Sequence, residues 1–130
     1  MRYLFNYTLL FLIGGTAYCI IELLWRSKTH YSMFFAGGII FIILSFVGLK
    51  METAPLIQKC LLGMIIITAI EFIFGYIFNI KFNMNVWDYS NMPLNFLGQI
   101  CMPFSILWFF LCIIIYKLIL NNNFYNFFFK

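Results

Sequence analysis

The chain has 130 residues, of which 65% are hydrophobic, 22% aromatic and only 9% charged. This composition excludes an ordinary soluble domain and predicts a membrane protein. The net charge of +4 does not indicate a nucleic-acid partner, because the basic residues are scattered singly along the chain and build no basic face.

The apolar residues fall into four runs, and a helix needs roughly 20 of them to cross a bilayer. The first run follows a charged start, as in a signal peptide, but no small-x-small cleavage site interrupts it, so we expect it to remain as a helix. The connections between the runs are short. The sequence therefore predicts an all-α membrane protein, a single domain over residues 1–130 in which four transmembrane helices form an antiparallel bundle. The expected spans are about 3–25, 33–49, 60–80 and 94–120.

A faint internal repeat suggests that the bundle consists of two tandem two-helix units. Thr16 and Glu22 in the first run correspond to Thr68 and Glu71 in the third, and each run leads into a glycine-containing apolar segment. Because each unit has two spans, both units would run in the same direction through the membrane.

The Lys and Arg residues of the connections predict the orientation. The end that holds both termini and the second connection has Arg2, Lys50, Lys59, Lys117 and Lys130, while the opposite end has Arg26, Lys28 and Lys81. This slight excess favours both termini in the cytoplasm and leaves insertion in both orientations open.

The main functional signal is a set of polar residues near the end that the first and third connections share. Nine residues separate Glu71 from Lys81, roughly 13 to 15 Å along a helix, so the Glu71 carboxylate is too deep to reach the headgroups. An ionisable group at that depth is costly unless it faces the bundle interior. We therefore expect Glu71 to point inward, as a functional contact or as a carboxyl group that locks helices together.

Four further residues complete the predicted pocket. Glu22 and Arg26 are spaced i, i+4 and can pair on one helix face, although an ordinary helix-end ion pair is also open. Asn95 and Gln99 have the same spacing in the expected fourth helix, where their amides would enter the bundle on one face and hydrogen-bond to the charged residues or act as polar glue. The predicted pocket is lined by Glu22, Arg26, Glu71, Asn95 and Gln99.

The segment just before the fourth run predicts a lid over this pocket. Trp87 and Tyr89 are typical of aromatic anchors at the membrane interface, and Asp88 with Ser90 can cap a turn. Pro93 would suit the first turn of the fourth helix. The predicted lid residues are Trp87, Asp88, Tyr89 and Ser90.

Three secondary candidates remain. Tyr18 shares a helix face with Glu22, and Thr68 shares one with Glu71. His30 is able to ligate a metal or transfer protons, but a lone loop histidine is more often simply solvated. No cysteine or histidine spacing indicates a metal site or another cofactor.

Two segments, GGTAYCIIELLWRSKTHYSMFFAGGIIF (14–41) and VWDYSNMPLNFLGQICMPFSILW (86–108), resemble a family of small bacterial multi-span membrane proteins, Putative ABC-transporter type IV. The resemblance implies a permease-like role in transport in the bacterial cytoplasmic membrane. An ATP-driven role would need a separate ATPase, because the chain has no GxxxxGK[ST] nucleotide loop.

These observations lead to two main hypotheses. In the first, the protein is a transporter or channel component, active as a homo-oligomer or with a partner membrane protein, whose pocket lines a path for a cation, a proton or a small polar solute. In the second, it is an accessory or scaffold membrane subunit, including the holin type. An enzyme is disfavoured because the sequence contains no catalytic motif. The expected partner is the lipid bilayer, and the sequence does not indicate the substrate.

Overall fold

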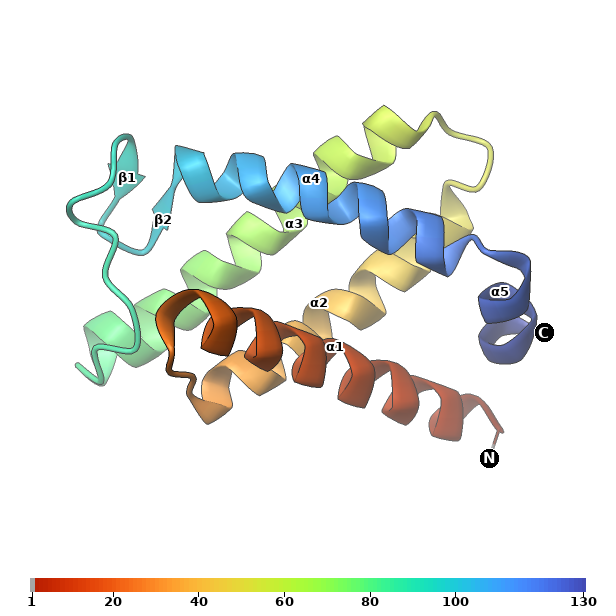
Figure 1. Cartoon of the computed structure of the whole chain (residues 1–130), viewed down its shortest axis with the longest axis horizontal. Coiled ribbons are helices and arrows are strands. Elements are labelled where there is room, and N and C mark those ends of the chain that lie inside the picture. The colour runs from red at the N-terminus through yellow and green to blue at the C-terminus, as the bar shows by residue number, and fades with distance from the viewer. Residues whose placement is uncertain (1) are drawn as a thin grey trace.

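The computed structural model describes residues 2–130, which form five α-helices, one π-helical turn and one short hairpin (Figure 1). The elements in chain order are α1 (Arg2–Arg26), α2 (Tyr31–Lys50), α3 (Leu56–Gly75), η1 (Tyr76–Lys81), β1 (Asn95–Phe96), β2 (Ile100–Cys101), α4 (Met102–Ile119) and α5 (Asn122–Phe129). The strands pair antiparallel, Asn95 with Cys101 and Phe96 with Ile100.

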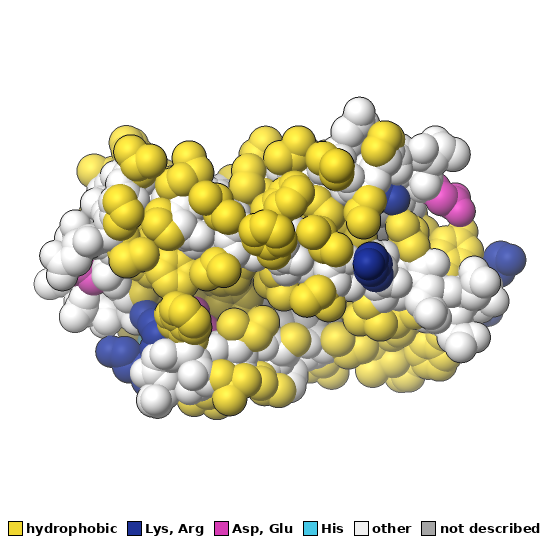
Figure 2. Space-filling view, turned by 45° about the horizontal axis from the view of Figure 1, so that its top comes forward, with side chains coloured by type: hydrophobic (Ala, Val, Ile, Leu, Met, Phe, Trp, Pro, Cys, Tyr) yellow, Lys and Arg dark blue, Asp and Glu magenta, His cyan; other side chains and the backbone are white. Residues whose placement is uncertain are grey.

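Four helical segments are long and apolar enough to cross a membrane: Leu4–Arg26, Tyr31–Lys50, Leu56–Lys81 and Met102–Ile119. Large apolar side chains point away from the bundle on these segments, for example Leu24 with 83% of its surface exposed. Hydrophobic side chains cover the middle of the molecule, and charged side chains gather toward its ends (Figure 2). Such a surface suits hydrocarbon rather than water, which confirms the prediction of an all-α, multi-pass membrane protein.

The spans pack as two antiparallel hairpins, α1 with α2 and α3 with α4. Contacts between α2 and α3 join the two hairpins. Glycines bring α1 and α2 together, because a Cβ atom at Gly14 would lie 2.5 Å from the Gly37 carbonyl oxygen, and one at Gly37 would lie 2.5 Å from Tyr18 Cβ. Close approach of this kind is how small residues stabilise helix pairs in lipid. By contrast, the backbones of α1 and α4 lie apart (Figure 1), and aromatic side chains join the two helices in the pairs Tyr18–Trp108 and Trp25–Phe104.

The two ends of the bundle carry different segments (Figure 1). Both termini and the α2–α3 connection lie at one end, where α5 folds back and the Asn6 side-chain amide donates to the Phe128 carbonyl oxygen at 2.8 Å. At the other end lie the α1–α2 connection and residues 82–101, which we call the lid segment. The candidate site is at the lid end.

The expected start of the fourth span near residue 94 is wrong, because α4 begins at Met102. Leu94, Leu97 and Gly98 have φ values of 53°, 54° and 71°, which lie in the left-handed region and interrupt a helix. Pro103 lies at the start of α4, where its missing N–H leaves no hydrogen bond unmade. Asn95 and Gln99 are therefore in the hairpin region rather than on one face of a helix.

Candidate functional site

Glu71 lies in α3 with its side chain directed into the bundle, and only 5% of its surface is exposed. One carboxylate oxygen, Oε2, accepts a hydrogen bond of 2.8 Å from the Trp108 indole Nε1 on α4. The other oxygen, Oε1, is buried and makes no hydrogen bond within ordinary distance limits among the residues that the structure describes. The Tyr89 hydroxyl is a second side-chain donor that interacts with this carboxyl group. One oxygen of a deeply buried acid is thus left without a hydrogen bond of ordinary length, which is unusual in folded proteins.

Aromatic side chains surround this carboxyl group. Tyr18 of α1 is 8% exposed, and its ring centroid lies 5.9 Å from that of Trp108. Tyr89 of the lid segment is 9% exposed and stacks on Phe104 at 4.8 Å. Burial raises the pKa of the Tyr89 hydroxyl well above its usual range, and the nearby Glu71 carboxylate raises it further. Tyr89 therefore keeps its proton and presents a hydrogen-bond donor on the Glu71 side of the lid.

Glu22 and Arg26 form an ion pair at the end of α1. Arg26 Nε donates to Glu22 Oε2 at 2.6 Å, and Arg26 Nη1 donates to the Val86 carbonyl oxygen at 3.0 Å. The ion pair that the i, i+4 spacing predicted is present, and it also fastens the lid segment to α1. The Arg26 side chain is 20% exposed and that of Glu22 is 11% exposed, so both are partly accessible.

Trp87 and Gln99 connect the two halves of the lid segment. The Trp87 indole Nε1 donates to the Gln99 carbonyl oxygen at 2.9 Å, and the Gln99 side chain accepts from Asn79 Nδ2 at 2.8 Å. Asn79 Oδ1 in turn accepts from the Val86 backbone N–H at 2.6 Å. The expected hydrogen bonds from Gln99 to Glu22, Arg26 or Glu71 are thus wrong, because the Gln99 amide bonds instead to Asn79 of η1 and to the Leu97 carbonyl oxygen.

Asn95 is likewise a lid residue and not a pocket residue. Its Nδ2 donates to the Met92 carbonyl oxygen at 2.9 Å and to that of Ser90 at 3.2 Å, and its Oδ1 accepts from the Gly98 N–H at 3.1 Å. The side chain is exposed, since it sits on the outer surface of the turn that it holds together.

The other lid residues differ from expectation in one respect. Trp87 and Tyr89 are 5% and 9% exposed. Their side chains are therefore buried at the end of the bundle and are not anchors among lipid headgroups. Asp88 Oδ1 accepts hydrogen bonds from the Ser90 hydroxyl and backbone N–H, which lower the pKa of Asp88. These bonds form the turn that the sequence predicted at Asp88 and Ser90.

His30 and Thr68 have structural partners. His30 precedes α2, and its Nδ1 accepts from the Ser32 backbone N–H at 3.2 Å as a helix cap. Thr68 Oγ1 lies 2.9 Å from Ser105 Oγ, which links α3 to α4. Within residues 2–130, no group of three or more His, Cys, Asp and Glu side chains is arranged to hold a metal ion.

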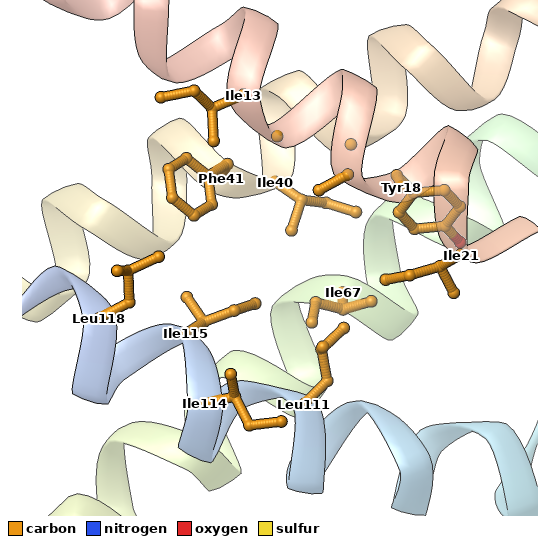
Figure 3. A pocket seen from close by; sticks show the side chains of 13 residues that line it. Ile13, Tyr18, Ile21, Ile40, Phe41, Ile67, Leu111, Ile114, Ile115 and Leu118 are labelled. Carbon is orange, nitrogen blue, oxygen red and sulfur yellow. The ribbon is translucent and has the colours of Figure 1, made fainter.

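A cleft separates α1 from α4 and consists of two adjoining cavities. The deeper cavity, of about 210 Å³, is almost wholly apolar, and side chains of α1 and α4 face one another across it (Figure 3). The second cavity, of about 290 Å³, is lined by Glu22, Arg26, Tyr89 and Trp108 among others. Ile21 and Leu111 border both cavities. Glu71 lies one side chain behind this cleft, held by Trp108 in its wall.

A family model described as Putative ABC-transporter type IV matches residues 9–129. The chain belongs to this family. The match extends well beyond the two segments that suggested the resemblance, and it includes the lid segment and all of α5. No solved structure matches the chain.

Two residues that the sequence analysis missed belong to the site of this Putative ABC-transporter type IV family member. Asn79 is a polar residue near the end of a long apolar run, which is a signal that could have found it. Trp108 gave no such signal, because tryptophan is ordinary in a membrane helix and its contact with Glu71 spans 37 positions of the chain.

Proposed function

We propose that the protein is a membrane component of a transporter and that its substrate reaches Glu71 through the cleft between α1 and α4. The observation that supports this proposal most strongly is the buried Glu71 carboxylate, whose Oε1 makes no hydrogen bond within ordinary distance limits among residues 2–130. A polar atom left unpaired away from water costs free energy, and ionisable residues inside membrane segments are most often functional.

The chemistry of this oxygen restricts the substrate. A carboxylate oxygen only accepts hydrogen bonds, so the group that completes the site carries a cation or a hydrogen-bond donor. Access is restricted as well, because the lid segment covers the end of the bundle while the cleft opens sideways between two membrane spans. The substrate is therefore a molecule that partitions into the membrane and carries a cationic or donor group.

One copy of the chain does not provide a polar path across the membrane within residues 2–130. The polar side chains of the site gather at the lid end, and the deeper cavity is lined by Ile, Leu and other apolar residues. Transport thus requires further copies of the chain or a partner membrane protein. We propose the bacterial cytoplasmic membrane for this assembly, as the family resemblance implies, and both termini in the cytoplasm, as the Lys and Arg distribution favours.

The closed hydrogen-bond network of the lid favours a second candidate, an accessory subunit without transport activity. Asn79, Trp87 and Gln99 satisfy one another, as they would in a purely structural element. In that case the substitution Glu71→Gln would lower thermal stability or the yield of a co-purified partner and leave no flux to measure.

Flux of ethidium, a fluorescent cation with an apolar body, distinguishes the two candidates. Proteoliposomes that contain DNA report its entry as a rise in fluorescence, driven by a membrane potential that is negative inside. We expect the wild-type protein to accelerate entry over protein-free liposomes, and Glu71→Gln to return the rate to that of the protein-free liposomes. The control is Glu52→Gln, which changes an exposed carboxylate in the α2–α3 connection and should leave the rate unchanged. Equal rates for the wild type and Glu71→Gln would contradict the proposal.

A further inference from the structure

We infer that the cleft between α1 and α4 binds a zwitterionic phospholipid, with one acyl chain along the cleft and the headgroup at Glu22 and Arg26. The inference rests on the same cleft as the proposed function, and it names the class of molecule that occupies it. Lipid occupancy is measured without transport, so the lipid assignment and the proposed transport function can fail independently of one another.

The polarity of the cleft changes along its length in the way that a phospholipid requires. Its lid end has the Glu22–Arg26 ion pair and the Trp25 ring, which is 67% exposed, as expected of tryptophan at the headgroup level. Its other end is lined by Ile13, Ile114 and further apolar residues. A headgroup at one end and hydrocarbon at the other would each meet a matching surface.

The length of the cleft agrees with one acyl chain. Arg26 and Ile13 border its two ends on α1 and are separated by about 20 Å along the helix. One leaflet contributes about half of the ~30 Å hydrocarbon core, which is close to this length. A second helix is too large, since a segment about 20 Å long and roughly 10–12 Å across occupies on the order of 1,500 Å³ or more, whereas the two cavities hold about 210 and 290 Å³.

The charges at the lid end suit a headgroup that has both a phosphate and an ammonium group. Arg26 uses Nε and Nη1 in its two hydrogen bonds, and no bond from Nη2 occurs within residues 2–130. Glu22 accepts through Oε2, and Oε1 has no partner in the same part of the chain. The guanidinium is thus free to bind a phosphate oxygen while the carboxylate binds the ammonium, both as charge-assisted hydrogen bonds.

Tryptophan quenching by brominated lipid tests this assignment. The chain has three tryptophans, and Trp25→Phe leaves only Trp87 and Trp108, which are both buried. This variant is reconstituted in vesicles with increasing fractions of phosphatidylethanolamine brominated in the middle of its chains. We expect saturable quenching that disappears when Trp108 is also replaced by Phe, because Trp108 lies in the cleft wall.

Two matched substitutions localise the lipid. Ile21→Phe fills the junction of the two cavities, whereas Ile20→Phe makes the same change at an exposed neighbour outside the cleft. Quenching should fall severalfold in Ile21→Phe and persist in Ile20→Phe. Equal quenching in both variants, or no quenching of Trp108 by any brominated lipid, would overturn the inference, and the second result would favour a protein partner in the cleft.

The headgroup is tested with brominated phosphatidylglycerol, which has the phosphate but no ammonium group. We expect half-maximal quenching at a several-fold lower fraction of phosphatidylethanolamine than of phosphatidylglycerol, and we expect Glu22→Gln to remove this preference. If the two lipids quench the wild-type cleft equally, the headgroup assignment is overturned.

Discussion

Glu71 is the residue on which the site depends, and Trp108 is its only hydrogen-bond partner among the described residues that meets ordinary distance limits. A carboxyl group at this depth depends for its stability on the groups around it, since only 5% of the Glu71 surface is exposed. The indole N–H therefore contributes more than packing, because it orients the carboxylate and leaves Oε1 as the free acceptor.

Trp108→Phe tests this role, because it retains most of the buried ring and removes the N–H donor. We expect a loss of about 1–3 kcal/mol in the free energy of unfolding, the usual cost of leaving a buried polar atom without its partner. The measurement is unfolding of the purified protein in detergent by heat or by SDS. Trp25→Phe is the control, since the Trp25 ring is 67% exposed, and it should change stability by less than about 0.5 kcal/mol. Similar losses in both variants would show that the hydrogen bond to Glu71 contributes nothing specific.

The helix pair α1–α2 sets the width of the cleft at the scale of whole elements. Gly14 and Gly37 hold α1 close against α2, so α1 is drawn to that side and away from α4. At the lid end, the hydrogen bond from Arg26 of α1 to the Val86 carbonyl oxygen holds the lid segment against α1. The cleft beside this contact stays open.

Gly14→Ala should separate α1 from α2. The new methyl group would meet Phe41 Cβ and lie 2.5 Å from the Gly37 carbonyl oxygen, and backbone atoms cannot yield without moving a helix. We expect a loss of about 1–3 kcal/mol in stability, as for other overpacked cores. The same substitution at Gly48 would place the methyl group 3.0 Å from an edge atom of the Tyr116 ring, which can shift slightly, so Gly48→Ala should cost clearly less. Unfolding midpoints of the two variants check the order, and the reverse order would contradict this packing.

At the scale of the whole molecule, the hydrophobic runs predict four spans and the approximate bounds of the first three, because burial of apolar length in a bilayer is a local property of the sequence; the fourth span begins later than expected, at Met102. The inward direction of Glu71 also follows locally, from its depth in its run. The hairpin around Asn95 and Gln99 does not follow, because the left-handed residues Leu94 and Leu97 are leucines, which carry no turn signal. That turn is held by tertiary hydrogen bonds to Trp87 and Asn79.

The cleft itself was also beyond prediction. Whether α1 packs on α2 or on α4 depends on which small residues meet across the bundle. The sequence contains glycines at positions 14, 15, 37 and 38, but it does not show which helices these glycines contact. The sequence thus identifies the acid and the ion pair of the site but not the opening that leads to them.

Reversible closure of the cleft tests the central claim most directly. The double variant Ile21→Cys, Leu111→Cys places one thiol on each wall of the cleft. A bifunctional thiol reagent joins the two thiols, and dithiothreitol reverses the cross-link. Cys19, the one native cysteine that is not classed as buried, is replaced by Ala in all variants. The control pair, Ile20→Cys with Phe110→Cys, places thiols on exposed positions outside the cleft. We expect ethidium flux to stop when the cleft is cross-linked, to return after dithiothreitol and to continue in the control pair. Undiminished flux through the cross-linked protein would contradict the central claim.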